Sequence, residues 1–295
     1  MQTTQSQKIE WRPYHDVYYE RHRHTVNGNI QIAQNVYSPQ LENHRDILIY
    51  LPPSYAHSQT HYPVLYMHDG YNLFDEATSY TGEWYVDETM EKLSAEENLE
   101  AIVVGIPSMG QDRLAEYSPF VDKAYGGGKG DAYLSFVVHT LKPLVDSSFR
   151  TLPNKRNTGI FGSSMGGLIS LYAFFRYPSI FGFAGVMSPS LWFANRAIFT
   201  YVEKAPYQQG KIYLDAGTRE MGGHWPDQTI LRSRSRRYYG RVRRMKRILA
   251  KKGYRPTRNL LHVEDVGGGH NEEAWAYRLP NAIRFFLGAS LKKVM

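Results

Sequence analysis

The chain has 295 residues, 42% of them hydrophobic and 14% aromatic, enough to bury the core of one large α/β domain. It has no cysteine, which excludes disulfides and thiolate metal sites. No apolar run has the length of a membrane span, and the first residues lack the apolar core of a secretion signal. We therefore expect a cytoplasmic protein with no membrane span.

The net charge of +7 comes from a single stretch of the chain. Eleven Arg and Lys residues lie between 232 and 252 with no acid among them, so the rest of the chain carries −4, the difference between +7 and +11. Apolar residues at Val242, Met245 and Leu249 recur at helical spacing, which predicts an amphipathic helix with a solvated basic face. Recruitment of an anionic substrate or surface is the alternative; no nucleic-acid partner is expected.

The N-terminal part of the chain predicts an arm followed by the edge of a sheet. Residues 1–25 are a mixture of polar and aromatic residues, and we expect them to lie as an arm over a single domain of residues 26–295. Residues 29–38 alternate polar and apolar, which indicates a half-exposed strand, and residues 45–51 form the next strand. The two strands are predicted to form the antiparallel edge of the sheet.

The rest of the chain alternates between buried-strand and helix patterns. The apolar run 63–67 is typical of a strand covered on both faces. The further predicted strands are 101–106, 181–187, 211–216 and 259–266, and the further predicted helices are 84–95, 133–145, 168–176 and 272–287. This order predicts an α/β fold with a mostly parallel central sheet of about eight strands and helices on both faces.

A glycine-rich turn between a strand and a helix carries the main chemical signal. Gly162-x-Ser164-x-Gly166 fits the nucleophile elbow, in which a serine sits on a sharp turn between two glycines. Ser163 lacks glycines at the corresponding positions. The following helix points its first amides at the reacting oxygen, so the N–H of Met165 is a candidate oxyanion donor.

An acid and a histidine follow in the order that this fold requires. Glu220 comes just after the turn that ends the strand at 211–216, and His270 follows the last predicted strand. Two other carboxylates compete with Glu220. Asp215 lies inside the apolar run, too early to reach the histidine, and Asp227 lies far along the next loop. The sequence therefore predicts a Ser164–His270–Glu220 triad.

These features resemble the branch of the α/β-hydrolases that holds enterochelin-type esterases, feruloyl esterases, S-formylglutathione hydrolases and mycolyltransferases. The resemblance covers about residues 45 to 288 and implies that fold with a serine esterase activity. It rests on the stretches His68-Asp69-Gly70-Tyr71-Asn72-Leu73-Phe74-Asp75, Gly82-Glu83-Trp84, Arg113-x-x-Glu116-Tyr117, Gly162-Ser163-Ser164-Met165-Gly166-Gly167, Ser188-Pro189-Ser190-Leu191-Trp192, Asp215-Ala216-Gly217-Thr218-Arg219-Glu220 and Gly269-His270.

The resemblance also implies further site residues. The N–H of Tyr71 would be the second oxyanion donor, beside that of Met165. Substrate contacts are expected from Arg113 and Tyr117 at the mouth of the site and from its aromatic walls. A structural contact between Arg113 and Glu116 is the alternative for Arg113, and a place in the hydrophobic core is the alternative for Trp192. The expected substrate-binding residues are Trp84, Arg113, Tyr117, Trp192 and Trp225.

The predicted function is hydrolysis of small or aromatic carboxylic esters through an acyl-enzyme, with no metal and no cofactor. Asp69 and Asp75 lack a third partner for a metal site. Three alternatives stay open: a siderophore trilactone esterase, an acyltransferase of the mycolyltransferase type, and an inactive binding protein on a hydrolase fold. A homodimer is compatible with the sequence.

Overall fold

A nine-stranded sheet runs through the molecule, with strand order β1-β2-β3-β5-β4-β8-β9-β10-β11. The computed structural model describes residues 9–19, 23–222 and 228–288. The sheet strands are β1 Arg12–Pro13, β2 Asn29–Ser38, β3 Asn43–Leu51, β4 Val64–His68, β5 Ile102–Ile106, β8 Thr158–Ser163, β9 Phe183–Met187, β10 Lys211–Gly217 and β11 Leu260–Asp265. The principal helices are α1 Tyr14–Val17, α2 Val86–Glu97, α3 Arg113–Glu116, α4 Gly130–Phe136, α5 Lys142–Ser148, α6 Met165–Arg176, α7 Phe193–Lys204, α8 Gln228–Lys252 and α9 Glu272–Leu287.

The sheet is parallel from β5 to β11 and antiparallel at the other edge, where β3 pairs with β5 and β2 pairs with β3. The predicted antiparallel edge is therefore confirmed. The sheet has one strand more than the expected eight. The additional strand is β1, in which Arg12 and Pro13 of the N-terminal arm pair with Ile32 and Gln31.

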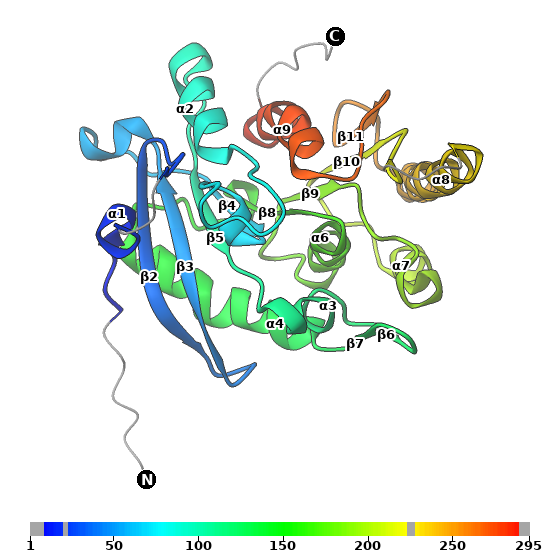
Figure 1. The fold of residues 1–295 in the computed structure, drawn as a ribbon, viewed down its shortest axis with the longest axis horizontal. Coiled ribbons are helices and arrows are strands. Elements are labelled where there is room, and N and C mark those ends of the chain that lie inside the picture. Colours follow the sequence, from blue (N-terminus) through cyan, green and yellow to red (C-terminus); the bar gives the residue numbers. More distant parts are fainter. Residues whose placement is uncertain (1–8, 20–22, 223–227, 289–295) are drawn as a thin grey trace.

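Helices cover both faces of the sheet, as predicted (Figure 1). On one face α2 and α9 pack over residues such as Leu65, Val103 and Phe161. On the other face α4 to α8 pack over residues such as Tyr66 and Ile160. Since side chains alternate between the faces of a strand, the fully buried strands β4, β5 and β8 supply both layers.

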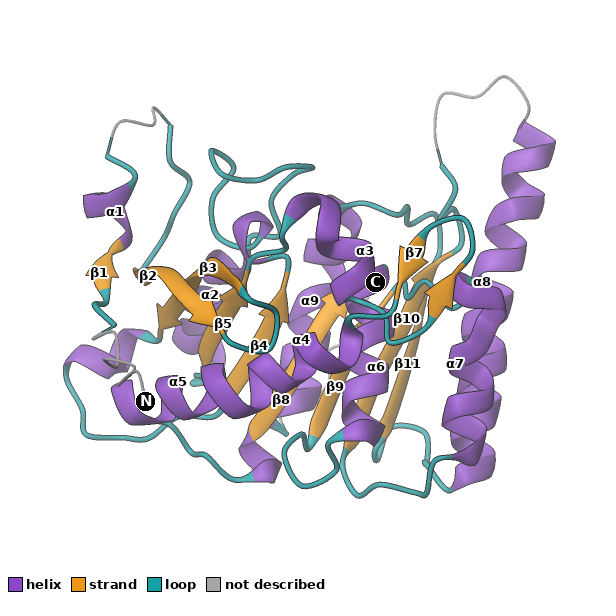
Figure 2. Ribbon diagram, turned by 90° about the horizontal axis from the view of Figure 1, so that it is seen from below, coloured by secondary structure: helices purple, strands orange, loops and turns teal. Residues whose placement is uncertain are grey.

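The basic stretch forms the longest helix, α8, which stands at the β11 side of the sheet (Figure 2). Its buried side chains include Tyr238, Val242, Met245 and Leu249, while most of its arginines are exposed. The predicted amphipathic helix is thus confirmed. Across the parts of the chain that the structure describes, no helix is both long and apolar enough to cross a membrane.

The long segment between β5 and α4 has short elements of its own. It contains α3 and a small hairpin of β6 Val121–Asp122 and β7 Gly126–Gly127. The helix predicted at 133–145 extends from α4 to α5 through one π-helical turn at Val137–Leu141. Pro143 at the beginning of α5 has no N–H to continue the ordinary α-helical ladder, which accounts for this irregular turn.

Candidate active site

Ser164 lies on a strained turn between β8 and α6. Its backbone has φ 55° and ψ −117°, a conformation that costs a non-glycine residue free energy and is found at nucleophile elbows. The turn is held by two backbone hydrogen bonds, from Ser164 N to Met187 O at 3.0 Å and from Ser190 N to Ser164 O at 2.9 Å. Ser163, by contrast, is a buried strand residue.

The glycines beside the serine are needed because the strand and the helix approach closely. A Cβ on Gly162 would lie 2.8 Å from His68 Cδ2 and 2.9 Å from the backbone of Gly166. His68 is a buried residue of β4, and its Nδ1 lies 2.7 Å from the hydroxyl of Tyr133. Burial lowers the pKa of His68 to about 3, so the imidazole that packs against Gly162 of the elbow is neutral.

His270 and Glu220 meet at the ends of two neighbouring parallel strands. His270 Nδ1 lies 2.5 Å from Glu220 Oε2, and the Glu220 side chain is fully buried. The loops after β10 and β11 are joined by a backbone hydrogen bond of 2.9 Å from Arg219 N to Gly268 O. Gly217 also packs against Gly268, since a Cβ there would lie 2.1 Å from its carbonyl oxygen. The geometry therefore brings together the acid and the histidine that the sequence predicted.

The other oxygen of Glu220 is held by two donors. Oε1 accepts hydrogen bonds of 2.6 Å each from Ser188 Oγ and from Gly217 N. Ser188 Oγ in turn accepts a hydrogen bond of 2.9 Å from Arg278 Nη2, and Arg278 Nε donates to Asp215 Oδ2 at 2.8 Å. Asp215 is thus part of the support behind the acid, and its two oxygens are bound by Ser188 N, the Tyr213 hydroxyl and Arg278. The competing Asp227 lies outside the described residues.

The ring of His270 is held between two aromatic side chains. It packs edge-on against Tyr238 of α8, with 5.4 Å between ring centroids, and against Trp275 of α9, with 5.0 Å. The Tyr238 hydroxyl donates a hydrogen bond of 2.7 Å to Ser188 O, so α8 contacts the same support. The ring keeps an open edge, since the His270 side chain is 25% exposed.

The proposed oxyanion loop follows β4. Asp69 has a left-handed backbone, with φ 56° and ψ 47°, and leads into a single 3₁₀ turn at Gly70–Asn72. Asp69 binds Arg113 through two hydrogen bonds of 2.7 and 2.8 Å, and its N–H donates to the Tyr117 hydroxyl at 3.0 Å. Burial opposes ionisation of Asp69, but Arg113 outweighs it and lowers the pKa of this carboxyl. This network fixes the loop on which Tyr71 lies.

Ser164 and His270 line one cavity of about 970 Å³. Its walls come from the loop after β4, the loop after β5 and the beginning of α9. The lining residues are Asp69, Tyr71, Asn72, Ala77, Thr78, Ser79, Tyr80, Thr81, Trp84, Ser108, Gly110, Gln111, Arg113, Ser163, Ser164, His270, Glu272 and Trp275.

Two of the predicted substrate residues, Trp84 and Arg113, line this cavity, and two do not. Tyr117 is fully buried, and its hydroxyl serves the oxyanion loop, so its predicted place at the mouth is wrong. Trp192 packs against the hydrophobic core and against Tyr125 and does not line the cavity. Its alternative role, in the core, is the one that the structure shows. Trp225 lies outside the described residues.

The alternative Arg113–Glu116 contact is also wrong. Arg113 binds Asp69, and Glu116 binds Arg45 through two hydrogen bonds of 2.8 and 3.0 Å in the protein interior. Sequence reasoning missed Glu272 as a cavity residue and Ser188 and Arg278 as the support of the acid. An arginine on the inward-facing side of the apolar helix α9 was the available signal for Arg278.

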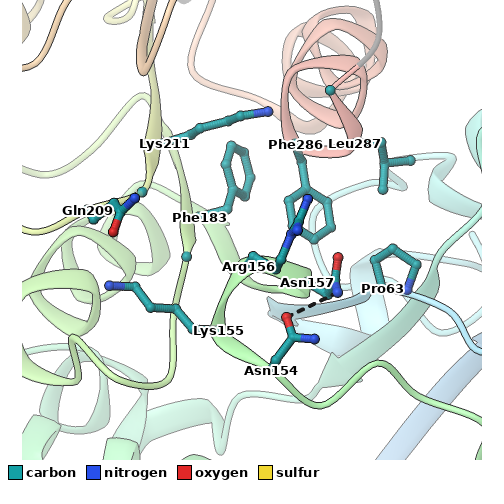
Figure 3. A pocket seen from close by; sticks show the side chains of 13 residues that line it. Pro63, Asn154, Lys155, Arg156, Asn157, Phe183, Gln209, Lys211, Phe286 and Leu287 are labelled. Atoms are coloured by element: carbon teal, nitrogen blue, oxygen red, sulfur yellow. Dashed lines mark hydrogen bonds between the residues drawn. The ribbon is translucent and has the colours of Figure 1, made fainter.

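A second cavity, of about 600 Å³, lies at the opposite edge of the sheet, where the parallel strands begin (Figure 3). Lys155, Lys211, Phe183 and Phe286 are among its lining residues. Its described lining contains no serine, histidine or carboxylate, so it offers no nucleophile and base. The cavity at the strand ends, where α/β folds place their sites, is therefore the candidate active site.

A match to the family described as "Putative esterase" covers residues 38–286. The chain belongs to this esterase family. It is therefore a carboxylic ester hydrolase with an α/β-hydrolase fold, as its sequence predicted.

The chain is also similar to a curated protein and to solved structures. The protein YbbA of Bacillus subtilis (strain 168) is 27% identical over 251 residues, which cover 83% of this chain and 93% of YbbA. The siderophore hydrolase EstA from Aspergillus nidulans has a similar structure, with a TM-score of 0.71 at 19% identity over 88% of this chain and 95% of EstA. The BES protein from Bacillus cereus has a TM-score of 0.69 at 19% identity, over 91% of this chain and 98% of that protein.

Proposed function

We propose that this esterase works through an acyl-enzyme on Ser164, with His270 as the base and Glu220 as the acid that orients it. The strained elbow conformation of Ser164 and the 2.5 Å contact between His270 Nδ1 and Glu220 Oε2, at one cavity, support the proposal best. An ionised carboxylate can only accept a hydrogen bond, so Nδ1 carries the proton and Nε2 is left to act as the base.

The reaction follows from this tautomer. His270 Nε2 takes the proton from Ser164 Oγ while that oxygen attacks the ester carbonyl, and the N–H groups of Tyr71 and Met165 stabilise the oxyanion. The intermediate then expels the alcohol, which receives the proton from His270. His270 then takes a proton from a water molecule that attacks the acyl-enzyme, and the carboxylic acid product is released from Ser164. Glu220 stays ionised and stabilises the imidazolium in both steps.

The cavity favours a bulky or aromatic ester as the substrate. Its volume of about 970 Å³ is in the upper part of the range for small-molecule sites, and Tyr71, Tyr80, Trp84 and Trp275 are among its walls. The only guanidinium in the described lining is that of Arg113, and Asp69 already neutralises it. A neutral aromatic acyl or alcohol group therefore fits the walls better than a strongly charged one.

A siderophore lactone is the second candidate, because EstA, which has a similar fold, is a siderophore hydrolase. Acyl transfer to an alcohol would use the same acyl-enzyme. A panel of p-nitrophenyl esters, methyl ferulate and a catecholate trilactone, with kcat/KM measured for each, ranks these substrates. Sugar or alcohol acceptors in the same assay reveal transesterified product.

Ser164→Ala is the control for this panel. We expect methyl ferulate or another aromatic ester to give the highest kcat/KM and the variant to hydrolyse none of the panel. An active Ser164→Ala variant would refute the proposed nucleophile. A wild-type chain that binds these esters without hydrolysing any of them would instead favour the inactive binding protein.

A further inference from the structure

Three carboxylates meet at the beginning of α2, behind the wall of the catalytic cavity. Glu83, Asp87 and Glu88 each place one carboxylate oxygen within 4.8 Å of the others. Glu83 is 3% exposed and Asp87 is fully buried, while Glu88 is half-buried. Carboxylates this close and this buried need a counter-charge or protons, because burial of an uncompensated charge is very unfavourable.

The hydrogen bonds around these residues satisfy only part of their acceptor capacity. Glu83 Oε2 accepts from Thr25 Oγ1 at 2.7 Å, and Asp87 Oδ2 accepts from Asn27 N at 2.6 Å. The remaining oxygens Glu83 Oε1 and Asp87 Oδ1, and Glu88 Oε2 beside them, are buried and accept no hydrogen bond from any residue that the structure describes. Buried polar atoms almost always have partners, so three such oxygens together indicate a missing positive ligand.

The charges near the three carboxylates have the same sign. Asp75 and Glu76 lie close enough to Glu83 to act on it electrostatically. In the described parts of the chain, no Lys, Arg or His forms an ion pair with Glu83, Asp87 or Glu88.

We propose that Glu83, Asp87 and Glu88 bind one hard divalent cation of the Ca²⁺ or Mg²⁺ type. The donor set consists of oxygens alone, which such cations prefer. Oxygens up to 4.8 Å apart can share one centre, since opposite Ca²⁺ ligands, at about 2.4 Å each, lie that far from one another. Water completes the coordination.

The position of the cluster gives this cation a structural role. Thr25 and Asn27 come from the segment that leads into β2, whereas Glu83 ends the loop that begins after β4. Trp84, the residue next to Glu83, lines the catalytic cavity, but none of the three carboxylates does. The cation therefore joins the N-terminal segment to the cavity wall without contact to substrate.

The test is cation binding by the full-length protein after treatment with EDTA. Isothermal titration with CaCl₂, MgCl₂ and MnCl₂ should give saturable binding of one ion, and thermal unfolding should show a rise in Tm of about 5 °C at saturation. Absence of saturable binding of all three ions at millimolar concentration would overturn the proposal, and the carboxylates would then hold protons.

Matched variants identify the site. Asp87→Asn and Glu83→Gln should each lower the affinity for the cation at least tenfold and remove the rise in Tm. Glu96→Gln, on the exposed face of the same helix, should bind as the wild type does. Wild-type affinity in Asp87→Asn would overturn the assignment. If the buried variants do not fold, Glu88→Gln, at the half-buried ligand, carries the same comparison.

Discussion

Ser188 Oγ donates a hydrogen bond of 2.6 Å to Glu220 Oε1 and accepts one of 2.9 Å from Arg278 Nη2. Arg278 is 1% exposed and also binds Asp215 and Asp265, at the ends of β10 and β11. The proposed catalytic acid is thus held by a buried arginine on α9 through a single serine hydroxyl. The strand ends that carry the acid and the histidine share the same arginine.

Ser188→Ala should lower kcat about tenfold and leave KM nearly unchanged, because the lost hydrogen bond goes to a charged group that acts only through His270. A double-mutant cycle with Glu220→Gln separates this role from simple packing. Ser188→Ala should have little further effect on kcat once Glu220 is replaced. Additive losses would contradict the role of Ser188. Ser118→Ala, another fully buried serine with local hydrogen bonds, is the control.

Glu220→Gln should lower kcat by about 10²–10⁴ with little change in KM, because it removes the group that fixes the tautomer of His270 and stabilises its cation. Asp215→Asn should act mainly on stability. Its carboxylate is fully buried against Arg278, which keeps Asp265 as a partner in the variant, so the loss of stability should stay below the roughly 3–5 kcal/mol of a fully broken buried ion pair. Urea unfolding and steady-state kinetics measure the two effects. A stable but inactive Asp215→Asn enzyme beside an active Glu220→Gln enzyme would reverse the assignment.

Ser164→Ala should reduce ester hydrolysis by about 10³ or more without unfolding the protein. Ser163→Ala should retain most of the activity, because Ser163 is a buried residue of β8 and lacks the strained backbone of its neighbour. Turnover of a p-nitrophenyl ester and thermal unfolding of both variants check the pair. If the Ser163 variant were the inactive one, the elbow would have been assigned to the wrong serine.

Much of this arrangement follows from local sequence patterns. Apolar runs mark the buried strands, and the helical period of the basic stretch marks α8. The glycines around Ser164 mark the elbow, because only residues without a Cβ fit against His68 at that turn. The chain order of serine, acid and histidine then selects Glu220 and His270 as partners.

Side-chain direction could not be predicted in the same way. Tyr117 and Trp192 belong to stretches that resemble motifs of the site. The Tyr117 hydroxyl nevertheless accepts a hydrogen bond from the oxyanion loop in the interior, and Trp192 packs on the core. The partners of Arg113 and Arg45 depend on which loop residue each guanidinium meets, and those contacts join residues 44 and 71 positions apart. Spacing along the chain does not encode such pairs, so the sequence offered only the nearer Glu116 for Arg113.

The stability of the fold should fall on acidification in part through His68. Burial lowers its pKa to about 3 in the folded chain, whereas an unfolded histidine titrates near 6.5. Between these values the unfolded chain binds a proton that the folded chain does not. The free energy of unfolding therefore decreases as the pH falls from about 6.5 towards about 3.

His68→Gln should flatten this dependence, since glutamine cannot take up the proton. Urea unfolding at pH 7, 5 and 4 measures the slope in the wild type and the variant. His139→Gln, at an exposed histidine, should keep the wild-type slope. An unchanged slope in His68→Gln would show that other groups dominate the acid sensitivity.

Arg113→Met distinguishes two roles for a residue that lines the cavity. If Arg113 binds substrate, as its predicted role states, KM should rise. The structure instead shows its guanidinium engaged twice with Asp69, at the beginning of the loop that carries Tyr71. Loss of those bonds leaves a largely buried carboxylate without its partner and releases the loop that is proposed to present an oxyanion donor. We therefore expect kcat to fall about tenfold or more, with KM for a neutral p-nitrophenyl ester little changed.

Arg113→Lys should restore part of kcat, because a lysine can keep one of the two bonds to Asp69. A higher KM with wild-type kcat in Arg113→Met would return the residue to substrate binding.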